Sequence, residues 1–215
     1  MKPSEFKCKK LFQKAYESRY TWPDYFNGYR GKCIFIDNNK SFEGDFIINN
    51  NFKIEVKNIM DDEIVKNISS QLFEVSIHRV KRNFSDIHQK NNFEFLAESK
   101  DGIEMKVSGK NEGDKYKVKE NKINMVYRHI HGVIIEIFVE DFLDTGNGFL
   151  SKKYTSQQLD INKKTPKSKA LEYIDNYINL DKNKLWVLES RLIKYLGKDG
   201  QKMSKKFYFK EISVI

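Results

Sequence analysis

The sequence predicts an α+β protein built on a strongly curved antiparallel sheet, a half-barrel or open barrel with about three helices covering its concave face. About ten strand-like segments follow one another in hairpin order, which a parallel sheet does not allow. Three segments with helical periodicity lie near the start, a third of the way along, and near the end. Their apolar stripes need a sheet surface to cover them, which favours a half-barrel over a closed barrel. We expect a single domain over residues 1–215.

The first third of the chain predicts one helix and three strands. The helix runs from Ser4 to Tyr20, where apolar side chains recur at helical spacing, and it ends before Trp22-Pro23. Strand-like segments follow at 32–37, 42–48 and 52–57. Strict alternation in the last of these predicts that Phe52, Ile54 and Val56 point inward.

A second helix and several hairpins are expected in the middle of the chain. Acidic residues at 61–63 suit a helix N-terminus, and apolar residues recur at helical spacing from Ile64 to Val75. Asp101-Gly102 and Gly113-Asp114 are turn signals between strands. The segment 116–140 is strand-like almost throughout, with a bulge, bend or turn expected at Gly132.

The last third predicts a third helix and a long hairpin. Thr165-Pro166 resembles an N-cap followed by proline at the first helical position, and an apolar stripe runs from Ala170 to Ile178. The segments 185–196 and 203–214 flank an Asp199-Gly200 turn.

The composition favours a folded protein in a reducing compartment. The chain has 215 residues, of which 39% are hydrophobic, enough for one sizeable core. No apolar run approaches the ~18 residues of a membrane-spanning helix, and the charged segment Met1 to Lys10 does not resemble a signal sequence. Cys8 and Cys33 are too few for a disulfide framework. We expect a cytoplasmic protein that can attach peripherally to a membrane.

The charge balance suggests an anionic partner. Lysine and arginine total 39 against 30 acidic residues, a formal net charge of +9. Such a surface attracts nucleic acid, anionic lipid headgroups or an acidic protein, but lysine is also the default residue of solvated positions in a sequence this rich in Lys, Asn and Ile. The chain has no recognisable nucleic-acid-binding module, so nucleic acid is not an expected partner.

Several motifs resemble those of an uncharacterised family found in cyanobacteria and plant plastids. They are Ala15-Tyr16-Glu17 with Arg19-Tyr20-Thr21-Trp22, His78-Arg79 with Arg82 and His88, Arg128-His129-Ile130-His131-Gly132, and Gly148-Phe149-Leu150-Ser151 with Tyr154. That family has no assigned reaction, so the resemblance implies a photosynthetic host and no catalytic residues.

A weaker similarity concerns architecture. The segment from Ser190-Arg191 through Asp199-Gly200 to Ile212 is similar to the last hairpin of the periplasmic lipoprotein-carrier half-barrels. Those carriers are exported and we expect no export signal in this chain, so a shared shape does not imply a shared function.

Arginine is scarce in this sequence, so the positions where it persists are candidates for bidentate or stacking roles. The alternative is that these arginines pair with carboxylates such as Glu17 or Glu136. An aromatic run beside them either lines the mouth of an apolar pocket or closes one end of the sheet. The candidate ligand-binding residues are Arg19, Tyr20, Trp22, Tyr25, Phe26, His78, Arg79, Arg82, His88 and Arg128.

Two histidines are a candidate metal site. His129 and His131 would share one face of a strand and could hold one ion if a third ligand joined them. They also share that face with Val133 and Ile135, which indicates burial and hydrogen bonding instead. No cofactor is expected.

Two functions of different classes remain open. The first is a non-enzymatic binding or assembly protein that holds a lipid, a pigment or another amphiphile, or docks on an anionic membrane surface or a protein partner. The second is a small metal-dependent or acid–base enzyme centred on His129 and His131. The lack of nucleophile and phosphate-binding motifs favours the first, with no catalytic residue assigned.

Overall fold

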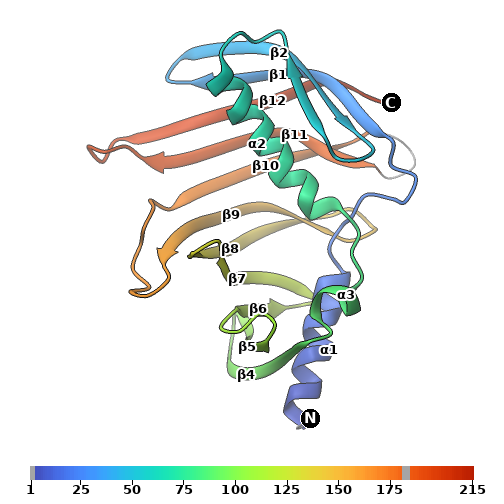
Figure 1. Cartoon of the computed structure of the whole chain (residues 1–215), viewed down its shortest axis with the longest axis vertical. Helices are drawn as coiled ribbons and strands as arrows, with labels where there is room; N and C mark the ends of the chain where they lie inside the picture. Colours follow the sequence, from blue (N-terminus) through green and yellow to red (C-terminus); the bar gives the residue numbers. More distant parts are fainter. Residues whose placement is uncertain (1–2, 181–184) are drawn as a thin grey trace. The chain divides into compact units, whose positions relative to one another are not determined.

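The computed structural model describes residues 3–180 and 185–215, which divide into two compact units (Figure 1). Unit 1 comprises the described residues within 1–20 and 82–172, and unit 2 comprises those within 21–81 and 173–215. Each unit takes up two separate stretches of chain, so no single linker divides the sequence. Folding as one domain stays a prediction.

All twelve described strands belong to an antiparallel sheet that does not close. The strand order is β4-β5-β6-β7-β8-β9 in unit 1 and β3-β2-β1-β12-β11-β10 in unit 2. The predicted antiparallel sheet is confirmed, and its successive hairpins explain why most neighbours in space are also neighbours in sequence. Helical cover of a concave face stays a prediction.

Unit 1 combines six strands with two helices. The helices are α1 (Pro3–Glu17) and α3 (Phe84–His88), and the strands are β4 (Asn91–Ser99), β5 (Gly102–Gly109), β6 (Lys115–Lys119), β7 (Lys122–Ile130), β8 (Val133–Asp144) and β9 (Phe149–Asp160). Phe12 of α1 is buried, and its ring centroid lies 4.7 Å from that of Phe93 and 4.5 Å from that of Tyr116. The predicted apolar stripe of the first helix therefore packs on the sheet.

Unit 2 combines six strands with one long helix. The helix is α2 (Asp62–Arg79), and the strands are β1 (Gly28–Asp37), β2 (Lys40–Asn49), β3 (Ile54–Lys57), β10 (Leu171–Asn179), β11 (Trp186–Leu196) and β12 (Lys202–Val214). The Asp61 side chain caps α2 by accepting hydrogen bonds from the backbone N–H groups of Glu63 and Ile64. Ile68 and Leu72 are fully buried where α2 lies across one face of the sheet (Figure 1).

The predicted helix over 165–178 is wrong, because residues 165–170 are not helical and Leu171–Asn179 form strand β10. Tyr173 and Asp175 alternate in burial with exposed or half-buried neighbours, which is a two-residue period. Two tyrosines and two isoleucines are among the nine residues of β10, and both residue types fit a pleated surface. Pro166, expected to start the helix, instead forms a bridge with Leu159.

The predicted strand at 52–57 is shorter than expected. β3 begins at Ile54, and Phe52 lies outside it with a φ of 64°. The Phe52 ring instead stacks with Trp22 and Phe26, at centroid distances of 5.9 and 5.6 Å. Ile54 and Val56 are half-buried.

The hairpin turns fall where the sequence predicts them. β4 and β5 pair up to Ser99 and Gly102, and β11 and β12 flank the Asp199-Gly200 turn. Gly102 needs its φ of 119° and has no room for a Cβ, which would lie 2.4 Å from the Val118 carbonyl oxygen. These turns are specified by a few adjacent residues, which is why a short sequence motif such as Asp-Gly identifies them.

Candidate functional site

Each unit contains a buried aspartate that an arginine binds, with a tyrosine two residues further along the chain. The residues are Asp114, Tyr116 and Arg128 in unit 1, and Asp175, Tyr177 and Arg191 in unit 2. A buried carboxylate needs such partners because burial disfavours an unpaired charge.

The unit 2 centre is a tightly bound ion pair. Arg191 and Asp175 are 2% and 0% exposed. The Arg191 Nε donates to Asp175 Oδ1 at 2.8 Å and its Nη2 donates to Oδ2 at 2.7 Å. From α2, Gln71 accepts a hydrogen bond from Arg191 Nη1 at 2.9 Å, and a Glu74 carboxylate oxygen lies 3.3 Å from the same nitrogen. The pair therefore ties the helix to two strands.

A second arginine lies beside this pair and is bound differently. Arg79, the last residue of α2, is 9% exposed. Its Nη2 donates to the Tyr177 hydroxyl at 3.3 Å, and Tyr177 donates onward to Asp175 Oδ2 at 3.2 Å. Its Nη1 is 3.5 Å from the His78 carbonyl oxygen. Within residues 3–180 and 185–215, Arg79 forms no salt bridge with a carboxylate.

The Tyr29 hydroxyl is the other unusual group at this end of unit 2. Tyr29 is 0% exposed, and its hydroxyl has no hydrogen-bond partner in the described chain. Burial raises the pKa of this phenol, while the charge of Arg79 acts in the opposite direction. Its ring contacts Trp22, Phe26 and Phe46 edge-on, at centroid distances of 5.8, 6.2 and 5.7 Å. The phenol therefore stays protonated at neutral pH. Its O–H group is a hydrogen-bond donor that lies inside an aromatic cluster.

The unit 1 centre is looser and more exposed. Asp114 is 1% exposed and accepts hydrogen bonds from Arg128 Nε at 3.3 Å and from the backbone N–H of His129 at 2.9 Å. The His129 Nδ1 lies 3.3 Å from the same carboxylate. The Arg128 side chain is 41% exposed. Arg128 thus pairs with Asp114 and not with the glutamates that the sequence suggested.

A buried neutral histidine accompanies this centre. His88 is 5% exposed, and its Nδ1 accepts a hydrogen bond from the Asn91 side-chain amide at 3.0 Å. Burial, together with the positive charges of Arg128, Arg19, Lys9 and Lys110, lowers the pKa of His88 to about 4. The imidazole is therefore uncharged at neutral pH.

The structure distributes the predicted ligand-binding residues over both units. Unit 1 holds Tyr20, Arg19, Arg82, His88 and Arg128, and unit 2 holds Trp22, Tyr25, Phe26, His78 and Arg79. In unit 1, the positive charges of Arg19 and Arg128 both lower the pKa of His88. Arg82 is exposed. Arg19 stacks on the Tyr16 ring at 3.8 Å.

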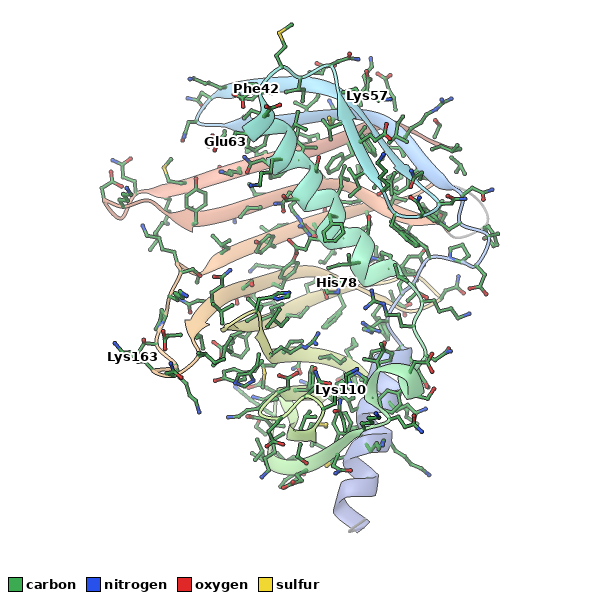
Figure 2. The ribbon with its side chains drawn as sticks, in the orientation of Figure 1. Phe42, Lys57, Glu63, His78, Lys110 and Lys163 are labelled. Atoms are coloured by element: carbon green, nitrogen blue, oxygen red, sulfur yellow. The ribbon has the colours of Figure 1, made fainter. Side chains whose placement is uncertain are left out.

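In unit 2, Trp22 is tied to Arg79 through the backbone, since the Trp22 N–H donates to the Arg79 carbonyl oxygen at 2.9 Å. Trp22 and Phe26 are buried and stacked at 4.2 Å, while Tyr25 is 59% exposed. His78 is exposed at the C-terminal end of α2 (Figure 2). Of the predicted residues in unit 2, Arg79, Trp22 and Phe26 therefore come together.

The premise of the predicted metal site is wrong. β7 ends at Ile130, and Ile130 pairs with Val133, so His131 and Gly132 form a two-residue turn. His131 has a φ of 48° and is exposed, so it does not share a strand face with His129. The described residues contain no cluster of three or more metal-ligating side chains.

Sequence reasoning missed the residues that bind these arginines. Asp175, Tyr177 and Arg191 were not singled out as site residues, and neither was Asp114. The signal that could have found them is the Asp-x-Tyr spacing, which occurs at Asp114-Lys115-Tyr116 and Asp175-Asn176-Tyr177. In a strand this spacing places carboxylate and phenol on one face.

The fold is an open antiparallel sheet with few helices, none of which, in the described residues, has the length and apolar character to span a membrane. The chain belongs to a family described as a protein of unknown function (DUF3386), whose model matches residues 4–215. The comparison with curated proteins found no significant match. Among solved structures, a DUF1329 family protein from Desulfovibrio piger matches with a TM-score of 0.30 and 7% identity, over 98% of this chain and 93% of that one.

Proposed function

We propose that the protein is a non-enzymatic binding module that holds an amphiphilic ligand by an anionic headgroup at Arg79 and Tyr29 of unit 2. One observation carries the proposal: a buried guanidinium without a carboxylate partner lies near a buried hydroxyl without an acceptor, within the described residues. The motifs shared with the cyanobacterial and plastid family make a photosynthetic organism the expected host.

The two donors, Arg79 and Tyr29, define the chemistry of the ligand group that would bind them. Burying a cation is costly unless an anion compensates it. The nearby carboxylate of Asp175 is already occupied by both Nε and Nη2 of Arg191 and by Tyr177. An anionic oxygen from outside the chain would satisfy both Arg79 and Tyr29, and carboxylate and phosphate groups both supply one.

The surroundings favour an amphiphile over a free anion. Trp22, Phe26 and Phe52 form a stack directly beside Tyr29. Tyr25, in the same segment, is 59% exposed. Aromatic side chains around a few placed polar groups are typical of ligand sites, where they contact the apolar part of the ligand.

Tryptophan fluorescence of the full chain tests this function. Both tryptophans lie in unit 2, and the Trp22 indole N–H donates to the Trp186 carbonyl oxygen at 3.0 Å. We expect laurate or dodecyl phosphate to change the emission with saturation, and dodecanol to bind far more weakly. A preference between laurate and dodecyl phosphate distinguishes a carboxylate ligand from a phosphate ligand.

Substitutions at Arg79 and Tyr29 test whether these two side chains bind the anionic headgroup. Arg79→Gln is expected to weaken binding of the anionic probes by about tenfold to a hundredfold, since a charge-assisted hydrogen bond contributes about 1.5–3 kcal/mol. Tyr29→Phe removes only the hydroxyl and should weaken binding less. Lys66→Gln, an exposed change on α2, is the matched control. Equal binding of dodecanol and laurate, or unchanged binding by Arg79→Gln, would contradict the proposal.

A further inference from the structure

The face of the unit 2 sheet opposite α2 carries lysines in register with aliphatic side chains. Lys206 of β12 pairs with Ile36 on one side and Leu192 on the other, and paired residues of antiparallel strands share a face. Tyr208 pairs in the same way with Ile34. The buried residues of β12, such as Phe207 and Phe209, alternate with these and point to the opposite face.

Positive charge dominates this face along β1, β11 and β12. We call it the lysine face and define it by its basic residues, Arg30, Lys32, Lys194, Lys202, Lys206 and Lys210. Lys32 forms an ion pair with Glu211 at 3.1 Å. Lys202, Lys206 and Lys210 are exposed and form no ion pair with a described residue. On the adjacent strand β2, Asp45 lies opposite Lys32 and Glu43 lies opposite Ile34, so both carboxylates share this face at its β2 edge.

Apolar side chains fill the spaces between these lysines. Ile34, Ile36, Leu192 and Tyr208 are all half-buried, so each presents part of its side chain to solvent. Leu196, opposite Lys202, is 53% exposed. The lysine face is therefore amphipathic over a continuous three-strand surface.

We propose that the lysine face docks unit 2 on an anionic phospholipid bilayer. Lysines near such a surface gain electrostatic attraction, and their long stems let aliphatic neighbours reach the interface while the ammonium groups stay among headgroups. Nucleic-acid surfaces rely on arginine and stacked aromatic rings to a greater extent. This face has one arginine and one tyrosine between its five lysines, so the bilayer is the better fit.

Co-sedimentation of the full chain with vesicles tests the docking. We expect binding to phosphatidylcholine vesicles that contain phosphatidylglycerol, and little binding to phosphatidylcholine alone. The triple variant Lys194→Gln, Lys206→Gln, Lys210→Gln should weaken binding about a hundredfold, because each lysine near an anionic surface contributes about a fivefold factor. The matched control replaces three exposed lysines of unit 1 by glutamine, at Lys100, Lys119 and Lys163.

Two further measurements distinguish membrane docking by the lysine face from ligand binding at Arg79 and Tyr29. Arg79→Gln should bind vesicles normally, and the triple variant should bind laurate normally, so each proposal can fail alone. Equal weakening by the triple variant and the unit 1 control would overturn the docking proposal, since only net charge would then matter. Binding to a single-stranded oligonucleotide but not to anionic vesicles would also overturn it.

Discussion

The two buried aspartates have the same neighbours in sequence but are held in different ways. Asp175 binds Arg191 through two parallel hydrogen bonds, and both side chains are almost fully buried. Asp114 binds Arg128 through one longer contact, and the arginine side chain is 41% exposed. Both aspartates are buried, so we expect the stability lost with each arginine to depend on how tightly that arginine is bound and on which partners the carboxylate keeps without it.

Replacing Arg191 by methionine should cause the largest loss of stability. The change leaves the Asp175 carboxylate buried without its cation, which costs about 3–5 kcal/mol of the free energy of unfolding. Denaturant titration followed by circular dichroism measures this loss. If the single variant does not fold, the double variant Arg191→Met, Asp175→Leu should restore folding, because no buried charge remains. Similar instability in the double variant would contradict the explanation.

The unit 1 centre should make stability depend on pH through His88. Its pKa is about 4 in the folded protein against 6.5 ordinarily, so the unfolded chain binds a proton first as the pH falls. The free energy of unfolding should therefore decrease by up to about 1.4 kcal/mol per pH unit between 6.5 and 4. His88→Gln should flatten this dependence, whereas His78→Gln, an exposed histidine, should leave it unchanged. Denaturation curves at several pH values provide the measurement.

Replacing Arg128 by methionine should have the smallest effect. Asp114 keeps the hydrogen bond from the His129 backbone N–H at 2.9 Å, and Arg128 is already half in solvent. We expect a loss of about 1 kcal/mol or less. The same denaturant titration as for Arg191→Met checks this, and equal losses for the two arginines would remove the distinction between the centres.

The parts of the fold that were predictable from the sequence are those specified by a few adjacent residues. Asp101-Gly102 and Asp199-Gly200 identify turns because glycine and aspartate suit that backbone. The segment 165–178 was predicted as a helix because a short apolar run can match either period. Its tyrosines and isoleucines fit a strand equally well, and pairing with other strands decides the outcome.

The candidate site was less predictable because its partners lie far apart in sequence. Scarcity of arginine drew attention to Arg79 and Arg128, whose role in binding stays a prediction, and their partners depend on strand register. Asp175 and Arg191 meet across neighbouring strands, and Gln71 reaches them from a helix 120 residues earlier in the chain. Such contacts follow from the packed structure and have no local signature.

The position of β1 in unit 2 has a consequence for synthesis of the chain. β1 pairs with β2 on one side and with β12 on the other, where Tyr29 lies opposite Val214. During translation, one edge of β1 therefore stays without its partner until the last strand has left the ribosome. An unpaired edge can template pairing with other chains, so nascent unit 2 is exposed to aggregation for almost the whole time of its synthesis.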